Sequence, residues 1–107
     1  MNDYQSNELE ITREYRNNLE GAYDKIVEKY GAGAARYEQA IARGESPEAT
    51  PTDDRESAAK LAEAKARMHV ADARVAALEG NHQVAREHEE TRKRLQRYCD
   101  RIRQIGV

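Results

Sequence analysis

The chain has 107 residues, of which 38% are apolar and 36% charged, and it carries a net charge of −2. A chain this short and this charged can bury only narrow apolar stripes, which is typical of coiled coils and thin helical bundles. The slightly acidic balance argues against a general nucleic-acid binder, and no apolar run approaches the ~18 residues of a membrane span.

The first predicted element is a long helix from about residue 6 to about residue 43. Its apolar positions recur at steps of three and four residues, which places them on one helical face. They are Ile11, Tyr15, Leu19, Ala22, Ile26, Tyr30, Gly33, Tyr37 and Ile41. We expect this stripe to form the core, with Tyr23 beside it as the exposed tyrosine and a candidate contact with a partner. Gly31 and Gly33 each weaken the helix by roughly 1 kcal/mol, so we expect a kink there or the close approach of another backbone.

A linker at residues 44–53 contains both prolines of the chain and separates this helix from a second one, at about residues 54–105. The stripe of the second helix alternates large and small side chains, from Leu61 and Ala64 to Met68 and Ala71. Small residues let a partner helix come close, and the tyrosines of the first helix can fill the gaps. The pattern therefore predicts an all-α fold, a long antiparallel helical hairpin resembling a coiled coil.

The register of the second stripe breaks at Gly80-Asn81. A continuous helix with a local register shift is the preferred interpretation, since a two-residue turn is short for long antiparallel helices. A turn at this point, giving a three-helix bundle, is the alternative.

In the continuous version the second helix extends past the first by roughly 20 Å at ~1.5 Å per residue. The overhang carries an apolar stripe with no partner inside the chain: Leu95, Tyr98, Ile102 and Ile105. An unpartnered apolar stripe predicts an intermolecular contact. We therefore expect a homodimer that completes a four-helix core.

Three groups of residues are candidates for chemical sites. Glu79 and His82 have the Glu-x-x-His spacing of di-iron bundles, but the facing stripe offers no further carboxylates, so we expect no metal or other cofactor. His69 and Asp72 lie one turn apart, and a surface hydrogen bond is the expected role. Cys99 lacks a catalytic partner and is expected to be a partly buried small side chain, with a crosslink between subunits on oxidation if the C-terminal helices meet at a two-fold axis.

The C-terminal segment is basic, with seven basic and four acidic residues in residues 86–107, a net charge of +3. Arg94, Arg97 and Arg101 fall on one helical face and could contact phosphates or an acidic protein. Acidic residues interrupt this face, so nucleic-acid binding is the alternative function.

The patterns together predict a non-enzymatic module for protein–protein contact: an adaptor, an assembly or secretion chaperone, or a small inhibitor. No nucleophile motif, phosphate-binding glycine loop or metal cluster is evident in the sequence. The N-terminus lacks the basic start and apolar segment of a secretory signal, so we expect a cytoplasmic protein, with signal-free export left open.

Overall fold

The computed structural model describes residues 2–106, and within that range every regular element is helical. The elements in chain order are α1 (Asp3–Tyr30), α2 (Ala32–Ala42), the 3-10 turns η1 (Pro47–Ala49) and η2 (Thr52–Asp54), α3 (Arg55–Leu78) and α4 (His82–Ile105). The predicted all-α class is confirmed. Across residues 2–106, none of the helices has the length and apolar character needed to cross a bilayer.

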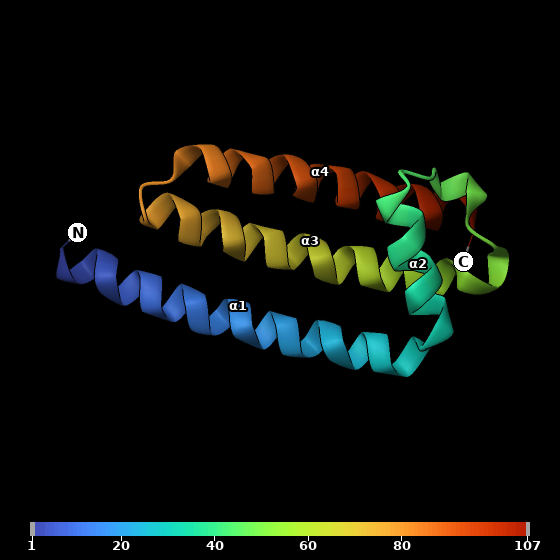
Figure 1. Ribbon diagram of the computed structural model, residues 1–107, viewed down its shortest axis with the longest axis horizontal. Coiled ribbons are helices and arrows are strands. Elements are labelled where there is room, and N and C mark those ends of the chain that lie inside the picture. The colour runs from blue at the N-terminus through green and yellow to red at the C-terminus, as the bar shows by residue number, and fades with distance from the viewer. Residues whose placement is uncertain (1, 107) are drawn as a thin grey trace.

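The three long helices form a single layer with α3 in the middle (Figure 1). α1 packs along one side of α3 and α4 along the other, and neighbouring helices run antiparallel. The short α2 crosses α3 near its beginning. The molecule measures 50 × 25 × 21 Å. Because α1 and α4 lie on opposite sides of α3, each leaves a lateral face that no other long helix covers.

The first predicted helix is divided in two at Gly31. Gly31 has a φ of 49°, a conformation that costs a residue with a side chain more than it costs glycine. Its N–H donates to the carbonyl of Val27 at 2.9 Å and so closes α1. Two residues later Gly33 lies against α3, where an added Cβ would meet Ser57 Oγ at 3.2 Å. The expected kink is therefore present, and what comes close at Gly33 is the side chains of Ser57 and Asp54, where another backbone was the expected neighbour.

The continuous helix over residues 54–105 was the wrong choice, and the alternative break at Gly80-Asn81 is the observed one. α3 ends at Leu78, and Gly80 has a φ of 80°, which reverses the chain. The N–H of Asn81 donates back to the carbonyl of Ala76 at 2.8 Å. The Asn81 side chain accepts from the N–H of Val84 at 3.4 Å, so it caps the start of α4. Three residues are enough for the turn because small side chains on α3 let α4 return in close contact.

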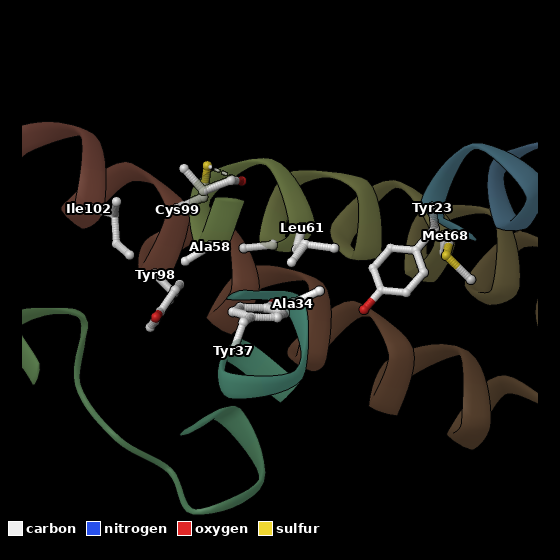
Figure 2. Close-up of a cluster of buried hydrophobic side chains, with 11 residues drawn as sticks. Tyr23, Ala34, Tyr37, Ala58, Leu61, Met68, Tyr98, Cys99 and Ile102 are labelled. Atoms are coloured by element: carbon white, nitrogen blue, oxygen red, sulfur yellow. Dashed lines mark hydrogen bonds between the residues drawn. The ribbon is translucent and has the colours of Figure 1, made fainter. Parts of the chain in front are cut away.

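The core lies where α2, α3 and α4 meet (Figure 2). Tyr37 of α2 and Tyr98 of α4 pack edge to face, with ring centroids 6.0 Å apart. Between the helices lie the small side chains of α3, among them Ala58, and the fully buried Leu61. This arrangement confirms the predicted packing of large side chains against small ones.

Candidate functional site

The C-terminal apolar stripe, predicted to face a second chain, lies in the chain's own core. Leu95 and Tyr98 are each 7% exposed and Ile102 is fully buried, while Ile105 is half-buried. The prediction assumed an overhanging helix, and the turn at Gly80 folds that overhang back along α3. These side chains therefore have an intramolecular partner, and the physical reason for a dimer at this place is gone.

Tyr23 was expected to be exposed and is instead buried, with 6% of its surface exposed. Its ring lies beneath Lys65, whose Nζ is 4.6 Å from the ring centroid. Its hydroxyl donates to the carboxylate of Glu38 on α2. Burial, together with the negative charge of Glu38, raises the pKa of the Tyr23 hydroxyl. The residue holds α1 against α2 and α3 and offers no contact surface.

The large apolar side chains that are exposed lie instead on the N-terminal half of α1. Tyr4 is 75% exposed, Ile11 66% and Tyr15 55%. Their spacing of seven and four residues places them on one face of the helix. We call this surface the α1 apolar face. The sequence pattern assigned Ile11 and Tyr15 to the core, so this surface is a correction to the prediction.

Ion pairs explain why α1 turns this face outward. Arg16 donates from Nε to Asp72 of α3 at 2.9 Å, and Arg13 lies 3.2 Å from Glu79. Arg74 of α3 pairs with Glu8 on the same stretch of α1. The contact between the first half of α1 and α3 is therefore largely polar, with Leu9 as its buried apolar member.

The predicted basic face of α4 is present. Arg94, Arg97 and Arg101 all line a shallow depression beside Pro47. Arg101 is paired with Glu48 at 2.5 Å, and its hydrogen bond lowers the pKa of that carboxyl. The face therefore carries less free positive charge than its three arginines indicate.

The Glu79 and His82 pair does not share a helix. Glu79 follows the last residue of α3, His82 opens α4, and the reversed backbone at Gly80 separates them. Glu79 pairs with Arg13 instead. The geometry needed for two ligands one turn apart is absent, because the Glu-x-x-His motif requires an unbroken helix.

Cys99 is fully buried, where its thiol donates to the carbonyl of Ala59 at 3.4 Å (Figure 2). Burial raises the pKa of this thiol. A high pKa and an inaccessible sulfur leave little thiolate to react, so the expected structural role fits. The predicted crosslink between subunits would require the core to open.

His69 lies at a site that the sequence did not reveal. It was expected to bond Asp72 one turn away, but its Nδ1 lies 2.9 Å from Nδ1 of His88 on α4. Asp72 instead accepts a hydrogen bond from Arg16. The three side chains His69, Asp72 and His88 are half-buried, and their ligand atoms lie within 4.8 Å of one another. His88 belongs to the apolar stripe of α4 by spacing, and only the turn at Gly80 brings it opposite His69.

The arrangement offers two kinds of site: an exposed apolar helical face on α1 and a cluster of two imidazoles and a carboxylate between α3 and α4. Comparison with known proteins found no match for the chain among family models, curated proteins or solved structures.

Proposed function

We propose that the chain is a non-enzymatic protein-binding module that pairs with a second copy of itself through the α1 apolar face. The observation that carries this proposal is the exposure of Tyr4, Ile11 and Tyr15 on one side of α1. Each exposes more than half of its surface to water, at a cost that burial against another surface would remove.

The spacing along α1 supports a second copy as the partner. Two antiparallel α1 helices, related by a two-fold axis that crosses their apolar faces at the height of residue 13, would place Ile11 of one copy against Tyr15 of the other. The same axis places Tyr4 against Ala22, since both pairs of numbers add to 26. The large Tyr4 would meet the small Ala22 at each end, and the large Tyr15 would meet the medium-sized Ile11 at the centre. Interdigitated helix pairs require such matching. Such an interface is self-complementary, which a two-fold dimer needs.

The charged surfaces remain free in this dimer for a different protein. Its role would be that of an adaptor, an assembly or secretion chaperone, or a small inhibitor. The basic face of α4 and the linker at residues 44–53, which has three acidic residues and no basic one, lie away from the α1 apolar face and suit such contacts.

Matched substitutions test where the dimer contact lies. Ile11→Glu would bury an unpaired charge in the contact and should raise the dimer dissociation constant on the order of 100-fold. Sedimentation equilibrium measures this constant. Val70→Glu is the control, because Val70 is 51% exposed on α3, outside that face, and it should leave the constant unchanged. Equal dissociation constants for wild type and Ile11→Glu would refute this location.

The alternative function, contact with nucleic acid, rests on Arg94, Arg97 and Arg101 lining one depression. Phosphate contacts are strongest at low salt, so binding should be tested at ~50 mM. Retention of DNA or RNA that Arg97→Glu abolishes would favour this alternative. We expect no retention of nucleic acid, since Arg101 is already paired with Glu48.

A further inference from the structure

The facing imidazoles of His69 and His88 bring their two Nδ1 atoms to one point between α3 and α4. Their Nδ1 atoms are 2.9 Å apart and their ring centroids 5.2 Å apart. Two neutral imidazoles can share only one proton at such a contact, so one Nδ1 donates and the other accepts. If both rings carried their proton on Nε2 instead, an ion could accept a lone pair from each Nδ1 and satisfy both nitrogens at once.

Asp72 supplies a third ligand from the same place. It lies one helical turn beyond His69 on α3, and its carboxylate, with both imidazoles, falls within 4.8 Å. Arg16 donates to Oδ1 of Asp72 at 2.9 Å, which leaves the second carboxylate oxygen for another contact. Carboxylates that bind metals are commonly held by a hydrogen-bond donor behind them, and Arg16 occupies that position here.

We propose that His69, His88 and Asp72 form a binding site for a divalent transition-metal ion of the Zn²⁺ class. Two imidazole nitrogens and one carboxylate oxygen suit this class, whereas Mg²⁺ prefers oxygen ligands alone. Zn–N bonds of about 2.1 Å in a tetrahedral site hold two nitrogens about 3.4 Å apart. The two rings therefore need to separate by about half an ångström. Water would complete the fourth position.

Metal binding at this site would connect three helices. His69 and Asp72 belong to α3, His88 to α4, and Arg16 reaches Asp72 from α1. Binding through both Nδ1 atoms would require the proton at the contact to move to Nε2 of its own ring, so that each ring is a neutral Nε2–H tautomer. Protons compete with the ion for both Nδ1 atoms, so the affinity would fall as the pH falls. The ion would then join the middle of α1 and α3 to the first third of α4.

The test uses the full chain after removal of metal with a chelator. Titration with ZnCl₂, followed by calorimetry and thermal unfolding, should show one ion per chain and a higher Tm. His69→Asn and His88→Asn should weaken binding on the order of 100-fold. His82→Gln is the matched control, because His82 is an exposed histidine at the start of α4. It should bind as the wild type does, and MgCl₂ should leave the Tm unchanged.

Two results would overturn the proposal: a wild-type chain whose Tm and heats do not respond to Zn²⁺, or equal Zn²⁺ binding by His69→Asn and the wild type. Circular dichroism checks that each variant is folded, and His69→Gln and His88→Gln replace any Asn variant that is not. The metal site does not depend on the α1 apolar face, so Ile11→Glu should bind Zn²⁺ as the wild type does. Failure of the dimer proposal can therefore be told apart from failure of the metal proposal.

Discussion

His69 on α3 and His88 on α4 meet with their Nδ1 atoms 2.9 Å apart, at the interface between the two helices. The contact joins residues nineteen positions apart across the turn at Gly80. A second proton at this point would turn one ring into a cation and set two N–H groups against each other in a half-buried place.

The stability of the metal-free chain should therefore fall in mildly acid solution. Burial, and then the neighbouring His88, lowers the pKa of His69, with Lys65 and Arg16 acting in the same direction and Asp72 opposing them. The unfolded chain then binds a proton before the folded chain does, so the free energy of unfolding decreases as the pH falls below about 6.5.

Urea unfolding at pH 7.5 and 5.5, with chelator present, measures this effect. His69→Asn should flatten the difference between the two pH values. Carboxyls whose pKa is lowered by ion pairs, such as Glu63, lose their contribution only in more acid solution, below the usual 4.5 of a glutamate. An unchanged pH dependence in His69→Asn would contradict the assignment.

The turn between α3 and α4 depends on the positive φ of Gly80. Gly80→Ala should destabilise the chain by about 1–2 kcal/mol, because a Cβ is unfavourable in that conformation. Gly21→Ala provides the opposite control: Gly21 lies within α1 with no neighbouring atom within 4 Å of an added Cβ. That change should stabilise the chain by about 0.5–1 kcal/mol. Chemical unfolding of both variants checks the signs, and a neutral Gly80→Ala would argue against the turn.

The hydroxyl of Tyr37 is buried without a hydrogen-bond partner among the described residues. Tyr37→Phe should therefore leave the free energy of unfolding unchanged or raise it. Tyr98→Phe is the contrasting variant, because the Tyr98 hydroxyl is 2.7 Å from Thr50 Oγ1. It should cost about 1 kcal/mol. If Tyr37→Phe proved the more costly of the two, the hydroxyl would have a partner that this packing does not provide.

Cys99 should resist thiol reagents as long as the core stays closed. Its side chain is fully buried and burial raises its pKa, so both access and thiolate content are low. A thiol reagent that releases an absorbing group when it reacts should label Cys99 slowly in buffer and completely in guanidinium chloride. Fast labelling of the native chain would mean that α4 separates readily from α3.

Much of the fold could be predicted from local spacing. Steps of three and four residues marked the helices, the two prolines marked the linker, and Gly31 marked the kink. The turn at Gly80 was the ambiguous point, because glycine followed by asparagine is compatible with a register shift and with a reversal. A register shift would place Leu95, Tyr98 and Ile102 in an interface between chains, whereas a reversal places them in the core.

The candidate sites were harder to predict, because they depend on pairs that are distant in sequence. Arg16 and Asp72 are 56 positions apart, and Glu8 and Arg74 are 66 apart. These pairs rotate the first half of α1 so that Ile11 and Tyr15 face outward, although their spacing matches the core stripe. Helical periodicity defines a face but not the direction in which it points.

The absolute mass of the wild-type chain in solution, by size exclusion with light scattering at two salt concentrations, tests the central claim most directly. An apolar contact through Tyr4, Ile11 and Tyr15 should survive added salt. The expected result is therefore a dimer, at twice the 12.2 kDa chain mass, under both conditions. A monomer at both salt concentrations would contradict pairing through the α1 apolar face.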